Sequence, residues 1–544
     1  MPLNLKSFFE RTERYFPANE VVSRQADGTL FRYTYGDYCV RTRRLASALA
    51  RAGVRAGDRV ATLGWNTYRH MELYFAVPCM DAVLHTVNIR IAEEHIAYIV
   101  NKAEDRLLFV DPDLLPAVQR LAPELPSLRQ IVVMGEIPAG CALDGLVEYE
   151  EFLASGEAGY EFPDVDEDNT CGMCFTSATT GLPKGVVYTQ RMLYLHTLTM
   201  CTADAVGIAE RDNILPVVPM FHVNAWGLPF AAMAVGAKMV LPGPQPDAAA
   251  ILDLIESEQV SFCAAAVTVG VQMYQALQQR PRDISSLREL MLGGSATPAS
   301  LMRAYAEHYG VSIYTAWGAT ECAPLATTTH LRRELLGAGD EARIAVRTRQ
   351  GIPVPGVDIK VLDEEGRAVP WDDGHPGEIY VRGHWIAKSY YEDERSRESF
   401  VDGWWKSGDI ATVGEDGSLR LVDRAKDLIK SGGEWISSVD LENQLMACPG
   451  VADAAVVAAP HPRWQERPIA FVVAEEGQSP PDKEELRTFL AQQFVKWWLP
   501  DDYVYVPALP RTGVGKVDKR ALRERAANLN RDDNHHGDQE ASNS

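Results

Sequence analysis

The 544-residue chain has no long apolar run, no basic excess and no signal-peptide core at its first residues. No uninterrupted apolar stretch approaches the roughly 20 residues that span a bilayer, so we expect no transmembrane segment and a cytoplasmic protein. Acidic residues outnumber basic ones by 75 to 53, which gives a net charge of −22. This charge argues against nucleic acid and against anionic membrane surfaces as partners.

Cysteine and lysine are also sparse. The nine cysteines are scattered and odd in number, which is typical of reduced thiols. Cys171 and Cys174 form a lone C-x-x-C inside an apolar run and have no second pair, so we interpret them as core residues. Only 13 residues are lysine, against 40 arginines. Four of these lysines, at positions 184, 426, 430 and 516, fall inside recognisable motifs, and all but Lys430 are considered below.

The length and the apolar pattern predict several domains of α/β type. A chain of 544 residues is too long for one core. Between residues 170 and 320, short apolar runs alternate with segments of helical period, and residues 32 to 133 show the same rhythm. Such alternation favours parallel sheets covered by helices. The predicted strands are 59–63, 106–110, 214–218, 237–241, 261–267, 290–293 and 312–314, and the predicted helices are 248–257, 268–279 and 298–309.

The character of the chain changes towards its C-terminal end. Short strands separated by Gly, Pro and Asp turns predict a β-rich subdomain at about 345–422, within an N-terminal domain of residues 1–423. A charged segment at 424–427 follows, and residues 428–525 are long enough for a small α+β domain, with a helix predicted at 482–494. The polar stretch 526–544 is predicted to be a disordered tail. The expected fold is therefore a large domain of two parallel-type sheets with a β subdomain, followed by a small mobile α+β domain.

A loop rich in hydroxyls lies between two strand-like runs at residues 176–185. Hydroxyl oxygens, backbone N–H groups and one ammonium group are suited to surround phosphate oxygens. The glycine spacing of a Walker A loop is missing. The candidate phosphate-binding residues of this loop are Thr176, Ser177, Thr179, Thr180, Gly181 and Lys184.

Two further loops follow strand-like runs, at the place where open α/β sheets bind ligands. The first contains Trp317, Gly318, Ala319, Thr320 and Glu321. Its carboxylate could hold Mg²⁺, which prefers one or two carboxylates together with phosphate oxygens, and its indole could lie against a purine. The second loop contains Gly294, Ser295 and Ala296, which could form a backbone wall for a nucleotide.

Four charged residues towards the C-terminal end complete the set. Asp409 could accept hydrogen bonds from the two hydroxyls of a ribose. Arg424 and Lys426 lie in the charged segment that precedes the last domain, and Lys516 lies between a glycine and a strand in a turn-rich loop. Each of these alone would be an ordinary solvated residue.

In this order and spacing, the motifs resemble those of the adenylate-forming enzymes, the superfamily of acyl-CoA synthetases, luciferases and peptide-synthetase adenylation domains. The resemblance implies ATP, Mg²⁺ and coenzyme A as ligands and a homodimer as a possible assembly. It implies that Thr320 contacts the α-phosphate, that Glu321 and Thr176 hold Mg²⁺, and that residues 294–296 lie along adenine and the acyl group. It further implies that Asp409 binds the ribose and that Arg424 binds the ribose or a phosphate. Lys426 would be the hinge, and Lys516 would be the catalytic lysine. The family usually has Gly where this chain has Ala178.

The segment 219–226 points to the acid. Amino-acid-activating members carry an Asp after the aromatic residue, whereas this chain has His222, so an α-amino acid is disfavoured. The segment resembles that of medium- and long-chain fatty acyl-CoA synthetases, which implies His222 beside the acyl carboxylate and Trp226 as a gate of an acyl tunnel. Ala266 and Gly270 would line that pocket, although Val267 replaces the usual Pro. An aromatic, branched or steroid-type acid stays an alternative substrate. Two alternative functions also stay open: an adenylating enzyme with an acceptor other than coenzyme A, and a non-catalytic nucleotide-binding protein.

Overall fold

The computed structural model describes residues 1–176, 182–329, 331–432, 434–475, 477, 480–511 and 517–528. The chain divides into two compact units. The larger unit contains residues 1–293, 301–359 and 381–405, and the smaller unit contains 294–300, 360–380 and the chain from 406 onward. Within the described residues, no helix is both long and apolar enough to cross a membrane.

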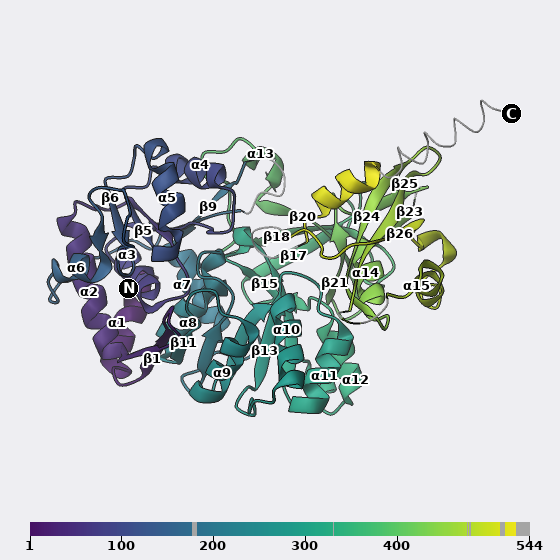
Figure 1. Cartoon of the computed structure of the whole chain (residues 1–544), viewed down its shortest axis with the longest axis horizontal. Coiled ribbons are helices and arrows are strands. Elements are labelled where there is room, and N and C mark those ends of the chain that lie inside the picture. The colour runs from purple at the N-terminus through teal and green to yellow at the C-terminus, as the bar shows by residue number, and fades with distance from the viewer. Residues whose placement is uncertain are drawn as a thin grey trace. The chain divides into compact units, whose positions relative to one another are not determined.

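A nine-stranded sheet forms one half of the larger unit (Figure 1). Its six central strands are parallel, whereas the strands beyond them on each side are antiparallel, as the α/β rhythm predicted. The helices α9 and α10 pack against each other beside it. In order, the strands are β16 (Ile352–Pro353), β15 (Leu325–Thr328), β14 (Ser312–Gly318), β13 (Glu289–Gly293), β12 (Phe262–Ala266), β10 (Asn213–Pro216), β11 (Lys238–Leu241), β1 (Glu20–Arg24) and β2 (Leu30–Thr34).

A seven-stranded sheet forms the other half, and only its edge strand β9 is antiparallel. The strands β4 and β5 are buried along their whole length, which explains the uninterrupted apolar sequence of β5. The order is β7 (Val147–Glu148), β6 (Gln130–Val133), β5 (Leu107–Val110), β3 (Arg59–Leu63), β4 (Val83–Thr86), β8 (Thr170–Phe175) and β9 (Gly185–Thr189).

Local sequence signals set the helices of the larger unit. Thr34 and Asp37 form a capping box at the start of α2, and Asp247 caps α9 through the backbone N–H of Ala250. The helices are α1 (Leu5–Tyr15), α2 (Tyr35–Arg51), α3 (Tyr68–Cys79), α4 (Glu93–Ala103), α5 (Leu115–Leu121), α6 (Tyr149–Ala154), α7 (Gln190–Met200), α8 (Leu228–Val235), α9 (Ala248–Glu258), α10 (Val267–Gln279), α11 (Ala299–Tyr309), α12 (Asp340–Arg347) and α13 (Ser396–Ser399).

The predicted β-rich segment forms a sheet with the order β17-β18-β20-β19, in which β21 also pairs with β20. The sequence predicts strands at 358–362 and 377–382 in this segment, and β17 and β18 begin and end within one residue of these positions. The boundary between the two units falls within β17, β18 and β20. The strands are β17 (Val357–Leu362), β18 (Gly377–Gly383), β19 (Phe400–Val401), β20 (Trp404–Val413) and β21 (Leu419–Arg424).

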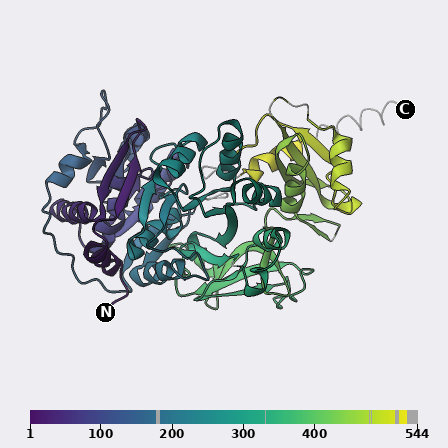
Figure 2. The same ribbon diagram turned by 90° about the horizontal axis from the view of Figure 1, so that it is seen from below.

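The C-terminal part of the smaller unit is an α+β module, drawn in yellow-green in Figure 2. Its sheet has the order β23-β22-β25-β24, and β26 pairs with β25 in parallel. The elements are β22 (Ile429–Ser431), β23 (Glu434–Ile436), α14 (Ser438–Met446), β24 (Val451–His461), β25 (Gln465–Ala474), α15 (Lys483–Leu490) and β26 (Asp502–Tyr505).

Two predicted boundaries in this module are wrong. The helix expected at 482–494 ends at Leu490, because the apolar residues after it reach the core from turns and a short 3-10 segment rather than from a continued helix. The tail expected from 526 begins too early, since residues 526–528 are helical and Ala526 is fully buried against the sheet. Residues 529–544 lie outside the described residues.

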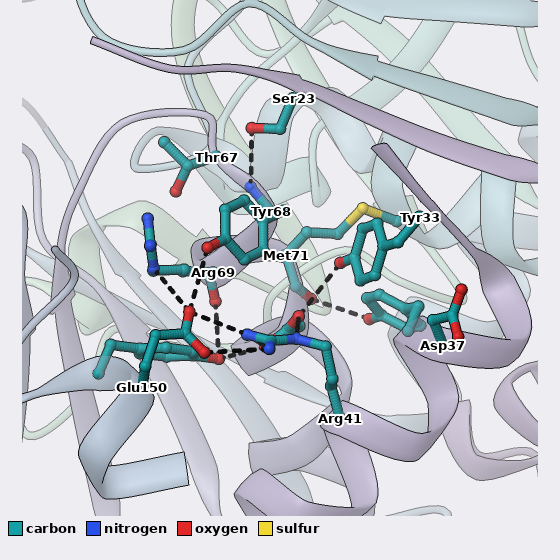
Figure 3. Close-up of polar contacts among 12 residues, drawn as sticks. Ser23, Tyr33, Asp37, Arg41, Thr67, Tyr68, Arg69, Met71 and Glu150 are labelled. Atoms are coloured by element: carbon teal, nitrogen blue, oxygen red, sulfur yellow. Dashed lines mark hydrogen bonds and ion pairs between the residues drawn. The ribbon is translucent and has the colours of Figure 1, made fainter. Parts of the chain in front are cut away.

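A buried ionic network ties α2, α3 and α6 together (Figure 3). Glu72 on α3 is fully buried and accepts hydrogen bonds from Arg41 Nε at 2.7 Å, from the Tyr149 hydroxyl at 2.6 Å and from the Tyr33 hydroxyl at 3.2 Å. Arg41 also donates to both oxygens of Glu150. Burial raises the pKa of Glu72, and the Arg41 guanidinium opposes that shift. The network therefore compensates a charge that would otherwise be costly to bury.

We expect Glu72→Ala to lower the free energy of unfolding by about 3 to 5 kcal/mol, because it leaves the half-buried Arg41 without its main partner. Urea denaturation followed by circular dichroism measures the change. Glu93→Ala is the matched control, since Glu93 pairs with Arg120 in an exposed ion pair, and such pairs contribute little to stability. Equal losses in the two variants would contradict a stabilising role for the network.

Candidate active site

The base of the predicted phosphate loop is closed by two hydrogen bonds between the ends of β8 and β9. The Thr176 N–H donates to the Lys184 carbonyl at 2.9 Å, and the Lys184 N–H donates to Thr176 Oγ at 3.1 Å. Thr176 and Lys184 therefore stand side by side at the carboxyl end of β8. The other predicted loop residues, Ser177, Thr179, Thr180 and Gly181, lie outside the described residues, as does Ala178.

Lys184 is linked to Glu321 through a tyrosine hydroxyl. Lys184 Nζ donates to the Tyr390 hydroxyl at 2.9 Å, and this hydroxyl donates to Glu321 Oε1 at 2.6 Å. Glu321 is 5% exposed and Tyr390 is 3% exposed, so the carboxylate and the hydroxyl are buried, whereas Lys184 is partly exposed. Burial lowers the pKa of Lys184, and the Glu321 carboxylate opposes that shift. The structure thus brings together two residues that the sequence predicted for phosphate and metal, 137 positions apart.

The loop that carries Thr320 and Glu321 turns tightly at the end of β14. The Thr320 carbonyl accepts a hydrogen bond from the Tyr188 hydroxyl at 2.7 Å, and the Glu321 carbonyl accepts one from the Ala387 N–H at 2.8 Å. A Cβ atom on Gly318 would lie 1.7 Å from the Pro324 carbonyl oxygen, so only glycine fits there. Trp317 and Gly318 are the last two residues of β14 and Ala319 follows them, whereas the sequence placed the whole motif after the strand.

The predicted acyl residues meet at the ends of two neighbouring strands. Ala266 at the end of β12 is the register partner of Gly293 at the end of β13. A Cβ atom on Gly293 would lie 2.8 Å from the Trp226 indole, so the indole covers this glycine. Gly270 lies one turn into α10, where its carbonyl accepts a hydrogen bond from the Tyr305 hydroxyl at 2.9 Å.

The segment that carries Trp226 has an unusual backbone. His222 is partly exposed and precedes a 3-10 segment at Val223–Gly227. All five residues of that segment have φ between +44° and +79°, a left-handed conformation that costs of order 1 kcal/mol or more for a non-glycine residue. Asn224 and Gly227 are residue types that tolerate this backbone, but Val223, Ala225 and Trp226 do not predict it. It sets the direction in which the indole leaves the chain.

In the smaller unit, Asp409 and Arg424 are register partners across β20 and β21. Arg424 Nε lies 3.2 Å from Asp409 Oδ1. Lys426 lies in the turn that follows β21, and burial lowers the pKa of its ammonium group. Gly294 and Ser295 are exposed and Ala296 is partly exposed, directly after β13. Lys516 lies outside the described residues.

The donor chemistry of the larger unit fits a magnesium–phosphate group. Among the described residues, no cluster of three or more His, Cys, Asp or Glu side chains could hold a metal ion alone. Tyr390 joins the buried Glu321 carboxylate to the Lys184 ammonium group, and the Thr176 hydroxyl accepts a hydrogen bond from the Lys184 N–H. These groups suit an ion that is bound mainly by phosphate oxygens. Glu321 and Thr176 would supply the protein ligands, and the ion would neutralise charge on the phosphate oxygens.

The fold and this array define an enzyme that handles a nucleotide phosphate at the strand ends of an α/β unit. Family models described as "AMP-binding enzyme" and "AMP-binding enzyme C-terminal domain" match residues 9–391 and 440–516, and the chain belongs to the AMP-binding enzyme family. This confirms the resemblance that the motifs indicated.

Individual relatives match over nearly the whole chain. A long-chain-fatty-acid–CoA ligase of Thermus thermophilus is 47% identical over 97% of this chain and 96% of its own length. A 3-methylmercaptopropionyl-CoA ligase of Ruegeria pomeroyi is 41% identical over 96% of this chain and 97% of its own. The crystal structure of an anthranilate CoA ligase in complex with anthranoyl-AMP superposes with a TM-score of 0.86 at 26% identity, covering 97% of this chain and 98% of that chain. This agreement confirms the predicted fold class.

Two residues of the site were not predicted. Tyr390 lies in a loop between β18 and α13, and Tyr188 is the next-to-last residue of β9. Neither position carries a local motif, because each tyrosine is defined by partners that lie far from it in the sequence. Only the folded arrangement identifies them.

Proposed function

We propose that the chain is an ATP-dependent acid–CoA ligase that activates a medium- or long-chain fatty acid. The acid's carboxylate attacks the α-phosphate of ATP to give acyl-AMP and pyrophosphate, and the thiol of coenzyme A then displaces AMP to give acyl-CoA. The observation that carries this proposal is the Lys184–Tyr390–Glu321 array, which places a cation and a carboxylate next to each other inside the protein. The full-length similarity to CoA ligases supports the same reaction.

The residues take the following roles in this proposal. Thr176, Ser177, Thr179, Thr180, Gly181 and Lys184 bind the phosphates, Thr320 contacts the α-phosphate, and Glu321 with Thr176 holds Mg²⁺. Asp409 and Arg424 bind the ribose side, while residues 294–296 with 317–319 surround adenine. Lys516 stabilises the charge that develops on the α-phosphate.

The two half-reactions need different surroundings for one bound intermediate. We propose that the C-terminal domain turns about the hinge at Lys426 after adenylation and withdraws Lys516, so that coenzyme A reaches the acyl-AMP. Coenzyme A brings its own thiol, so no cysteine of the chain is needed as a nucleophile. The nine cysteines are all free, which supports a reducing compartment such as the cytoplasm. A homodimer stays an expectation from the family resemblance.

The substrate acid is inferred from residues 219–226, the segment that precedes α8. His222 stands where amino-acid-activating relatives carry a carboxylate, so no partner for an α-ammonium group is present at this position. The Trp226 indole covers Gly293 beside Ala266 at these strand ends, and its displacement from the two small residues would make room for a bulky apolar acid. The same feature would admit an aromatic, branched or steroid-type acid, which is the alternative substrate class.

Acid-dependent AMP formation in the presence of coenzyme A tests the proposal. Saturated acids from C4 to C18 are compared with benzoic, cinnamic, steroid and 3-methylmercaptopropionic acids. We expect the highest kcat/KM between C8 and C18. A maximum of kcat/KM on a cyclic or sulfur-containing acid would support the proposed reaction but change the assigned substrate. AMP formation with no acid tested, alongside measurable binding of ATP, would contradict the ligase assignment.

A further inference from the structure

We propose that Tyr390 is a positioning residue that holds Lys184 and Glu321 in the arrangement needed to receive Mg·ATP. The inference rests on the proposed function for the identity of the ligand. It concerns the loop between β18 and α13, which carries Tyr390. Its central observation is one hydroxyl that contacts both charged groups.

The hydrogen-bonding capacity of this hydroxyl is fully used. A tyrosine hydroxyl has one proton to donate and two lone pairs to accept. Its proton goes to Glu321 Oε1, and its lone pairs accept from Lys184 Nζ at 2.9 Å and from Trp405 Nε1 at 3.4 Å. The direction of each bond is therefore set by the protein. The bond to Glu321 Oε1 orients the carboxylate.

The ring that carries this hydroxyl is itself fixed. The Tyr390 N–H donates to Ser396 Oγ at 2.9 Å, and the ring packs edge-on against Phe400 with centroids 5.1 Å apart. Lys184 Nζ lies 4.1 Å from the centroid of the Tyr390 ring, so the ring face also attracts the ammonium group. Loss of the hydroxyl alone would leave this packing in place.

The same loop holds the last residues of the phosphate loop. The Tyr391 N–H donates to the Gly185 carbonyl at 2.7 Å, and Arg395 Nη1 donates to the Leu182 carbonyl at 3.0 Å. Three neighbouring positions of the chain around Lys184 are thus contacted by this loop. Tyr390 and Arg395 contribute their side chains, and Tyr391 contributes its backbone N–H. The loop therefore aligns the lysine with the carboxylate by several independent contacts.

The physical reason for an intervening hydroxyl is electrostatic. A lysine and a glutamate inside a protein attract strongly, and a direct contact would neutralise both groups. The Tyr390 hydroxyl satisfies each of them with a neutral partner, so the ammonium group can turn to a phosphate and the carboxylate to Mg²⁺ without breaking an ion pair. Without the hydroxyl, the two charges can close on each other, and binding of Mg·ATP must then separate them.

The test is Tyr390→Phe, with Tyr391→Phe as the matched control. Tyr391 is the adjacent, partly buried tyrosine, and among the described residues its hydroxyl has no hydrogen-bond partner. The probe is the α,β-methylene analogue of ATP with Mg²⁺, titrated into the full chain by calorimetry without any acid. Hydrogen bonds to charged groups support a loss of affinity of about ten- to a hundredfold in Tyr390→Phe. Tyr391→Phe should stay within about twofold of the parent protein.

Two further measurements separate positioning from a general structural effect. In steady state, we expect the KM for ATP to rise in Tyr390→Phe while the KM for the acid stays unchanged. In a Lys184→Met background, Tyr390→Phe should weaken binding of the analogue much less than it does alone, because no ammonium group is left to close on Glu321. A loss of the same size in both backgrounds, or an affinity within twofold of the parent protein, would overturn the proposal. Failure to form acyl-CoA despite normal binding of the analogue would refute the proposed function and leave this inference standing.

Discussion

Gly318→Ala is expected to lower the rate of acyl-adenylate formation by about a hundredfold or more. The added Cβ atom would lie 1.7 Å from the Pro324 carbonyl oxygen and 3.3 Å from the Ala326 N atom. Both are backbone atoms of the turn that returns the chain from β14 to β15, so no side chain can move aside. Thr320 and Glu321 lie within that turn and must shift with it. A misplacement of about 1 Å at a reacting group can cost about 10²-fold in rate.

Pyrophosphate release, with hydroxylamine trapping the acyl-adenylate, measures this rate. Gly159→Ala is the control, because a Cβ atom on Gly159 meets nothing within 4 Å. We expect the control variant to retain the parent rate. If Gly318→Ala retained more than half of that rate, the turn could not be setting the positions of Thr320 and Glu321.

The strand ends of the larger unit explain how the sequence could point to much of the candidate site. Thr176 follows β8, Ala266 and Gly293 end β12 and β13, and Glu321 lies just beyond β14. In open α/β sheets, ligands bind at the carboxyl ends of the strands. A hydroxyl, glycine or carboxylate motif directly after an apolar run is therefore informative by itself. The alternating pattern supplied the strands, and the motifs supplied the chemistry.

The parts that could not be predicted depend on contacts between distant segments. The Tyr188 hydroxyl, from the seven-stranded sheet, reaches the Thr320 carbonyl beside the nine-stranded sheet. Tyr390 likewise joins Lys184 and Glu321 from a loop that has no periodic pattern. The left-handed backbone of Val223–Gly227 contradicts the preferences of Val223, Ala225 and Trp226, so tertiary surroundings must help to maintain it. Local propensity carries no information on any of these features.

The end of α15 shows the same limit in the smaller unit. The apolar residues Phe494, Trp497 and Trp498 all pack against one core, which made a longer helix plausible from the sequence. The structure satisfies the same burial with a turn and a 3-10 segment after Leu490. Burial thus determined which residues face the core, but not the backbone conformation that brings them there.

Lys516→Ala is expected to lower acyl-adenylate formation by about 10² to 10³-fold, the usual effect of removing one group that stabilises transition-state charge. In the proposed reaction its ammonium group contacts the α-phosphate only while the carboxylate attacks. The second half-reaction, from pre-formed acyl-AMP and coenzyme A, should therefore change by less than about threefold. The split between the two half-reactions distinguishes a chemical role of Lys516 from a role in folding, which would reduce both.

Single-turnover assays of each half-reaction measure this split. Lys483→Ala is the control, because Lys483 is an exposed lysine of the same unit and pairs with Asp502 at the surface. We expect the control variant to match the parent protein in both half-reactions. An unchanged rate of adenylation in Lys516→Ala would contradict the proposed mechanism, whereas equal losses in both half-reactions would contradict the withdrawal of Lys516 between them. Unequal losses would therefore assign Lys516 to the first half-reaction alone, which is the outcome that its withdrawal about the hinge at Lys426 requires.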